Sequence, residues 1–158
     1  MRGITGGRGI LGGTVLLAVG FGVLLEAIGV ADAGAYLFLF LGLAFALAYV
    51  AGTHQFVYLV PAASMIGFGL GLIIPTTFGL QAHASGIFLA SLAVGFLVVY
   101  LLAPARRIPL GVAAVIGVVA LADTFTTLPV LPDALKPYFV PIILIVTGAY
   151  LILEPRTN

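Results

Sequence analysis

Charge is what this sequence has least of. Only 11 of its 158 residues carry a formal charge, 6 basic and 5 acidic, which is 7% of the chain, whereas soluble globular domains carry about 25%. Hydrophobic residues make up 63% of the chain, and the mean hydropathy is +1.31. A surface so poor in charge would not stay dispersed in water. The composition therefore excludes a soluble enzyme, a secreted domain and a disordered tail, and it indicates a single membrane domain.

Cysteine is absent, which excludes disulfides, thiolate metal sites and a cysteine nucleophile and leaves the redox compartment open. The net charge of +1 gives no support to nucleic-acid binding, because neutralising phosphates takes several clustered basic residues. The sequence contains no serine-hydrolase elbow, zinc-protease motif, phosphate-binding loop or dinucleotide fingerprint. We therefore expect no cofactor, no metal site and no enzymatic activity.

Apolar runs fill most of the chain. A helix that crosses a bilayer needs about 20 mostly apolar residues. Six stretches qualify or nearly qualify, at about 10–28, 35–51, 56–74, 84–103, 108–124 and 135–153. The second and fifth of them are short. The sequence thus predicts an all-α fold, a polytopic bundle of six transmembrane helices that forms one domain over residues 1–158.

Prolines mark two features of these spans. A proline disfavours continuation of a helix, so we expect the third span to end before Pro75. Pro61 and Pro141 fall inside their spans and are expected to kink them. Such a kink can open a cavity between helices, as in transporters, or it can only shape the bundle.

The few charges predict the orientation. Six spans place both termini on one side of the membrane, and five of the six basic residues fall on that side: Arg2, Arg8, Arg106, Arg107 and Arg156. Only Lys136 falls on the other side. By the positive-inside rule the shared side is cytoplasmic. We expect a multi-pass protein of the cytoplasmic (inner) membrane with both termini in the cytoplasm.

Tyrosines recur with a period of about 50 residues. Tyr49, Tyr100 and Tyr150 each lie near the predicted cytoplasmic end of an even-numbered span. Two interpretations stay open: a tandem repeat of three helical hairpins, at about 8–52, 55–105 and 106–156, or the aromatic belt that many membrane proteins carry at the interface.

The hairpin pattern resembles the membrane region of the Lia-type (LiaI/LiaF-like) bacterial envelope-stress proteins. Residues 8–13 (RGILGG) and 24–29 (LLEAIG) are similar to the first half of that region. Residues 39–43 (LFLGL) and 141–148 (PIILIVTG) are similar to its second half. The resemblance implies a non-enzymatic membrane regulator or scaffold with a part in a stress response.

Glycine is abundant, with 21 residues. Lipid tails are as apolar as leucine, so helices in a membrane associate through small residues that let their backbones approach. Gly67, Gly69 and Gly71 make the third span the most approachable. These glycines would form either an interface for a partner or a second copy, or internal contacts within the bundle.

The ionisable residues offer one candidate polar site. Glu26, His83 and Asp123 all fall near the predicted outer membrane surface and could converge into a proton or cation site; otherwise they are polar helix ends. An enzyme would need Ser85 to pair with His83. At the cytoplasmic surface, Arg106 and Arg107 are expected to contact anionic lipid headgroups, with a docking site for a cytoplasmic partner as the other possibility.

Together these observations predict a non-catalytic membrane protein that acts as a scaffold, regulator or accessory subunit through helix–helix contacts. Its partners would be the lipid bilayer and either another membrane protein or further copies of the chain. The alternative is a small oligomeric transporter or channel for ions, protons or small solutes.

Overall fold

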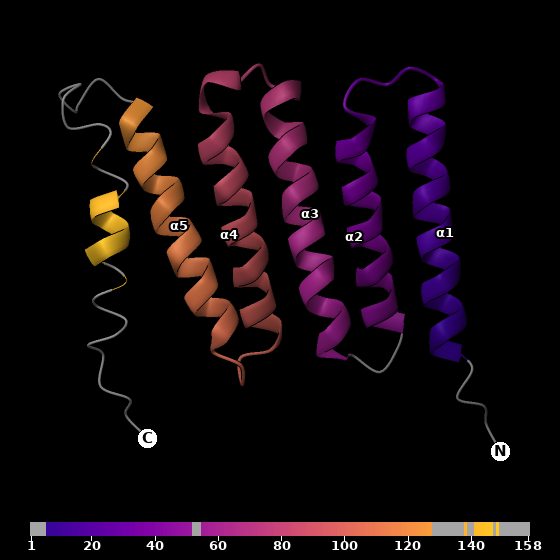
Figure 1. Ribbon diagram of the computed structural model, residues 1–158. Helices are drawn as coiled ribbons and strands as arrows, with labels where there is room; N and C mark the ends of the chain where they lie inside the picture. Colours follow the sequence, from indigo (N-terminus) through magenta and orange to yellow (C-terminus); the bar gives the residue numbers. More distant parts are fainter. Residues whose placement is uncertain (1–5, 52–54, 128–137, 139–140, 147, 149–158) are drawn as a thin grey trace.

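The computed structural model describes residues 6–51, 55–127, 138, 141–146 and 148 of the chain, and within them every regular element is a helix. The elements in order are α1 (Gly6–Ala27), α2 (Ala33–Ala51), α3 (Phe56–Thr77), the short 3₁₀ helix η1 (Gln81–His83), α4 (Ala84–Leu102) and α5 (Ile108–Thr127). Figure 1 shows α1 to α5 running up and down in turn. The predicted all-helical fold is confirmed for this part of the chain.

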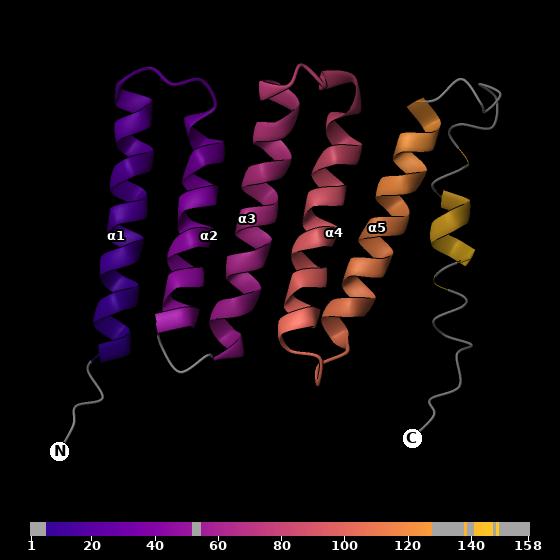
Figure 2. The ribbon, with the colours of Figure 1, turned by 180° about the vertical axis from the view of Figure 1, so that it is seen from behind.

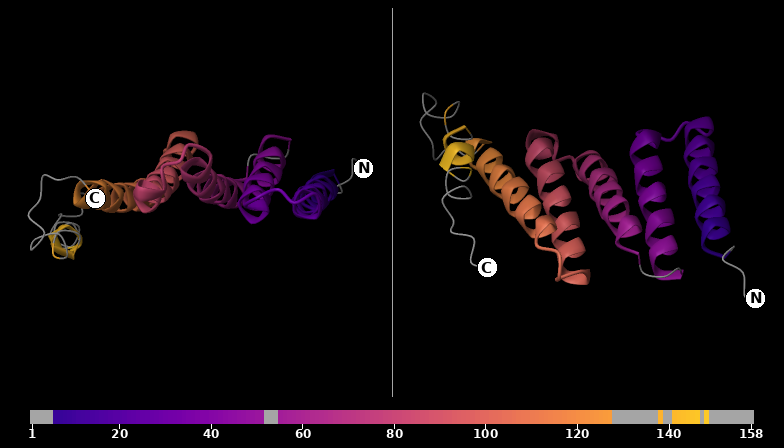
Figure 3. Two further views of the ribbon diagram at one scale, coloured as in Figure 1. Left: turned by 90° about the horizontal axis from the view of Figure 1, so that it is seen from above. Right: turned by 60° about the horizontal axis from the view of Figure 1, so that its bottom comes forward.

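The five long helices form a single row. Each of them packs only against its neighbours in sequence, so that α1 contacts α2 alone and does not reach α3, α4 or α5. The row looks the same from behind (Figure 2). Seen from above, it is one helix thick and gently waved (Figure 3). These helices therefore present two broad faces and do not close around a central core.

Four helices of the described part are long and apolar enough to cross a membrane. They are Ala33–Ala51, Phe56–Thr77, Gln81–Leu102 and Ile108–Phe125. In α1 the apolar helix Leu11–Ala27 is shorter than these four. A membrane protein with several spanning helices is thus supported, but the predicted count of six is not reached. The sixth predicted span, about 135–153, lies mostly outside the described residues.

The helix boundaries differ from the predicted ones by four residues at the start of α1 and by three at the ends of α3 and α5, and the difference at α3 involves a proline. This helix runs through Pro61 and continues past Pro75 to Thr77, so the expectation that Pro75 would end the span was wrong. Pro75 itself is fully buried. A proline inside a membrane helix is tolerated where other groups satisfy the freed backbone. The backbone beyond Pro75 remains hydrogen-bonded. Phe78 N–H donates to the Ile74 carbonyl at 3.0 Å, and Leu80 N–H donates to the Pro75 carbonyl at 2.9 Å.

The first two hairpins turn in the same way. Gly29 and Gly79 each lie two residues after a helix and have positive φ values of 78° and 69°, a conformation that glycine adopts without steric cost. In each case the next residue closes the helix end: Val30 N–H donates to the Leu25 carbonyl, and Leu80 N–H donates to the Pro75 carbonyl. This bond pattern is typical of a glycine-terminated helix. The same glycine turn thus ends both α1 and α3.

Small residues make the contacts between the helices. The buried apolar side chains are mostly alanine, with Leu59 and Val99 as the large ones. Aromatic rings add contacts between neighbouring helices, since Phe68 of α3 packs against Phe38 of α2 at 4.6 Å and against Phe88 of α4 at 4.9 Å between ring centroids. Packing by close backbone approach is what a lipid environment favours.

Candidate functional site

The three residues of the predicted outer polar site do not meet. Glu26 is exposed near the end of α1, and α1 contacts only α2. His83, also exposed, ends η1, which contacts α3, α4 and α5. Asp123 is half-buried on α5. The row separates Glu26 from the other two, and no group of three or more histidine, aspartate or glutamate side chains among the described residues could hold a metal ion.

Asp123 forms a polar contact that sequence reasoning missed. The Ser85 hydroxyl of α4 donates a hydrogen bond to Asp123 Oδ2 of α5 at 2.5 Å. Beside it, Gly86 lets α5 come close, because a Cβ there would lie 2.8 Å from Thr124 Oγ1. These residues join one end of α4 to α5. The only signal in the sequence is that 85 and 123 fall at matching ends of antiparallel neighbours.

This contact bears on the enzyme hypothesis. The Ser85 hydroxyl donates its hydrogen bond to a carboxylate oxygen of Asp123, and within the described residues no hydrogen bond joins Ser85 to the neighbouring His83. A serine nucleophile needs an adjacent base that takes its proton. The arrangement is that of a hydrogen bond between two membrane helices, which contributes about 0.6 kcal/mol on average in such proteins.

The three glycines predicted to pack helices lie inside the row. A Cβ on Gly67 would lie 2.8 Å from the Ser91 carbonyl oxygen of α4, and one on Gly71 would meet the same helix at Phe88 and Ser91. A Cβ on Gly69 would instead lie 2.8 Å from the Leu39 backbone nitrogen of α2. Ser91 Oγ also donates to the Gly67 carbonyl at 2.7 Å. These glycines therefore hold α3 against both neighbours and are not free for a partner.

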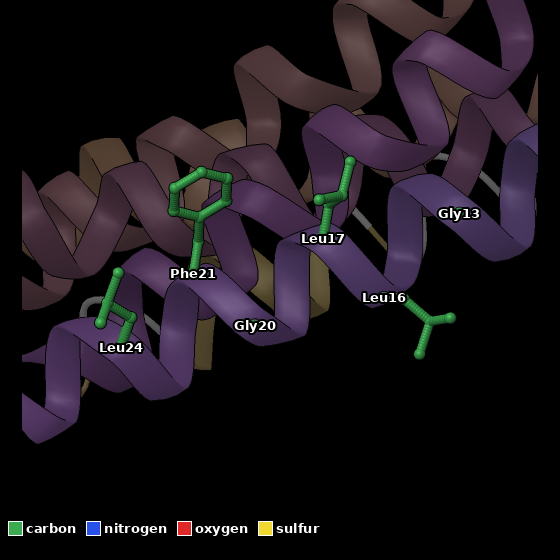
Figure 4. A pocket seen from close by; sticks show the side chains of 6 residues that line it. All are labelled: Gly13, Leu16, Leu17, Gly20, Phe21 and Leu24. Carbon is green, nitrogen blue, oxygen red and sulfur yellow. The ribbon is translucent and has the colours of Figure 1, made fainter.

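Three glycines of α1 are different, although Gly22 of the same helix packs against Leu37 of α2. A Cβ added to Gly12, Gly13 or Gly20 would have no heavy atom of another element within 4 Å. Gly13 and Gly20 line a shallow apolar pocket of about 540 Å³ whose walls all belong to α1. Figure 4 shows Leu17, Phe21 and Leu24 on one side of the helix and Leu16 on the other. We call this surface the α1 groove; its six lining residues are Gly13, Leu16, Leu17, Gly20, Phe21 and Leu24.

Arg106 and Arg107 lie in the connection between α4 and α5. The guanidinium carbon of Arg106 sits 4.3 Å from the centroid of the Phe56 ring at the start of α3. Both arginines line a pocket of about 380 Å³ between the ends of α3, α4 and α5. The sequence singled out this pair, but it gave no sign of the pocket or of the aromatic ring beneath Arg106.

The chain matches no protein-family model, no curated protein and no solved structure.

Proposed function

We propose that this chain is a non-catalytic integral membrane protein that acts as a scaffold, regulator or accessory subunit through helix–helix contacts, and that the α1 groove is its association surface. The proposal includes the cytoplasmic (inner) membrane as its location, with both termini in the cytoplasm, because five of the six basic residues fall on that side of the predicted spans. The resemblance to Lia-type membrane regions supports a regulatory role.

The observation that carries the proposal is the contrast between two sets of glycines. Gly42, Gly67, Gly69, Gly71 and Gly95 are each in tight contact with a neighbouring helix. On α1 the glycines at positions 12, 13 and 20 are open, whereas Gly22 packs against Leu37 of α2. Glycine costs about 1 kcal/mol relative to alanine inside a helix, and in membrane helices this cost is offset by close packing. Gly34 and Gly111 are open as well, but Gly13 and Gly20 line one continuous groove, which favours contact with a helix that is not part of this row.

The shape of the α1 groove supports the same conclusion. Gly13 and Gly20 are two helical turns apart on one face of α1, and so are Leu17 and Leu24. Alternating small and large residues with this spacing let a second helix lie alongside at a small crossing angle. Leu17 is 63% exposed and Leu24 is 53% exposed, so these two side chains are available to pack on it.

Co-purification in mild detergent tests the proposal. Two copies of the chain with different tags, expressed together in their native host, should elute as a complex, either with each other or with a second membrane protein of fixed stoichiometry. Gly20→Leu, which fills the groove, should dissociate the complex, whereas Gly12→Leu, which adds the same side chain outside the groove, should leave it intact. A chain that elutes as a solitary monomer before any substitution would contradict the proposal.

A further inference from the structure

The pocket between the ends of α3, α4 and α5 has polar and apolar parts at different depths. Its mouth is formed by the loop that carries Arg106 and Arg107. Its apolar wall includes Val60 and Val112, each one helical turn further from the helix end than Phe56 and Ile108. One helical turn corresponds to about 5.4 Å. In a bilayer the arginines would thus lie at the headgroup level, and the apolar wall would reach into the hydrocarbon.

The charge of this mouth is uncompensated within the described residues. No ion pair joins Arg106 or Arg107 to a carboxylate there, and the described acids Glu26, Asp32 and Asp123 lie at the opposite ends of the helices. The Phe56 ring holds the Arg106 guanidinium by a cation–π contact at 4.3 Å. Two positive charges beside an apolar pocket complement a ligand that has an anionic head and an apolar tail.

We propose that this pocket binds one anionic phospholipid, with its phosphate on Arg106 and Arg107 and an acyl chain along Val60, Phe96 and Val112. A guanidinium matches a phosphate because its planar donors can bind two oxygens at once. The apolar wall favours a phospholipid over a free phosphate, because a free phosphate would leave the apolar part of the pocket without a ligand group in contact. This inference goes beyond the proposed function, because it involves neither the α1 groove nor any partner protein.

Native mass spectrometry of the full chain tests the inference. The protein is released from nanodiscs that contain equal amounts of phosphatidylglycerol and phosphatidylcholine with identical acyl chains. The wild type should retain one phosphatidylglycerol in preference to phosphatidylcholine. Because both positive charges at the mouth of the pocket are removed, Arg106→Gln with Arg107→Gln should lower that preference by about thirtyfold.

Two further variants separate a specific site from general charge. Arg2→Gln with Arg8→Gln removes the same charge near the N-terminus, away from the pocket, and should leave the preference unchanged. Val112→Phe keeps both arginines and narrows the apolar part of the pocket, so it should also reduce retention of phosphatidylglycerol. It therefore tests the pocket even if the arginine variant fails to fold. Equal retention by the arginine variant, or no effect of Val112→Phe, would overturn the inference. So would displacement of the lipid by equimolar glycerol phosphate, which indicates a site for a soluble anion.

Discussion

At the scale of single residues, the glycines divide into those that a neighbouring helix needs and those that it does not. Gly67 and Gly71 are four positions apart, so they share one face of α3, and both contact α4. Gly69 points the other way, to α2. The helical period alone predicts that Gly69 lies on a different face of α3 from Gly67 and Gly71. The prediction of a single small surface formed by all three glycines did not separate these two faces. Which helix packs on each face cannot be predicted from the sequence.

Replacing Gly67 by alanine should weaken the fold. The added Cβ would meet the Ser91 carbonyl oxygen at 2.8 Å and Leu92 Cα at 3.2 Å, and neither backbone atom can move without shifting α4. Overpacking of this kind costs about 1–3 kcal/mol in the free energy of unfolding. Gly12→Ala is the matched control, because a Cβ there meets nothing, and it should leave stability unchanged or raise it by up to about 1 kcal/mol.

Unfolding of both variants in mixed micelles, followed by circular dichroism, measures the difference. Equal stability of Gly67→Ala and Gly12→Ala would show that α3 and α4 are not in close contact at Gly67.

The polar residues show where sequence reasoning reaches its limit. Glu26, His83 and Asp123 could all be assigned to one membrane surface, because each lies at the end of a predicted span. Whether they meet depends on the lateral order of the helices, which hydropathy does not encode. The row places Glu26 on α1 and Asp123 on α5, which are the first and the last of its five helices. The partner that Asp123 does bind, Ser85, lies on the adjacent helix.

At the scale of elements, hydropathy and turn residues predicted the helices well. The four spans from α2 to α5 begin and end within three residues of their expected bounds. Pro75 was the exception, because a rule for helix ends in water was applied to a helix that continues in lipid. The glycine turns at Gly29 and Gly79 carry a sequence signal that was overlooked, since both follow an apolar helix at the same distance.

Paired cysteines should report the order of the helices in the row. The chain has no cysteine of its own, so introduced pairs are unambiguous. A Cβ at position 117 of α5 would lie 3.8 Å from Ala93 Cβ of α4, which is close to the mean separation of about 3.8 Å in disulfides. Gly117→Cys with Ala93→Cys should therefore form a bond within one chain on mild oxidation, as seen by peptide mass spectrometry.

The matched control joins helices that do not touch. Gly20→Cys with Gly117→Cys places the two thiols on α1 and α5, which make no contact in the row. This pair should form no bond within one chain. An intrachain bond in the control, or none in the 93/117 pair, would show that the helices are ordered differently.

At the scale of the whole molecule, the row explains why contacts between the described helices leave many large apolar side chains exposed. Helices that touch only their neighbours in sequence bury one narrow strip on each side. The buried side chains are accordingly mostly alanine, while many large apolar ones are exposed. Lipid can cover most of that surface. The α1 groove is the part whose open glycines favour a helix over lipid chains.

The sequence predicted the membrane setting and the helical class from composition alone, but it could not predict the row. A closed bundle and an open row have the same hydropathy, the same span lengths and nearly the same small residues. What differs is which small residues are in contact, and that depends on how helices distant in sequence pack. The glycines of α1 and those of α3 look alike in the sequence, yet Gly67, Gly69 and Gly71 all touch other helices, whereas on α1 Gly22 packs against α2 and Gly12, Gly13 and Gly20 are open.

Photo-crosslinking in native membranes tests the central claim most directly. A photoactivatable phenylalanine analogue replaces Leu17, which is 63% exposed in the α1 groove. Irradiation should give one adduct of defined protein mass, either a second copy or a distinct partner. This adduct should disappear with Gly20→Leu and persist with Gly12→Leu. Adducts to lipid alone, or a protein adduct that Gly20→Leu leaves unchanged, would contradict the claim that this chain acts through a helix packed in the α1 groove.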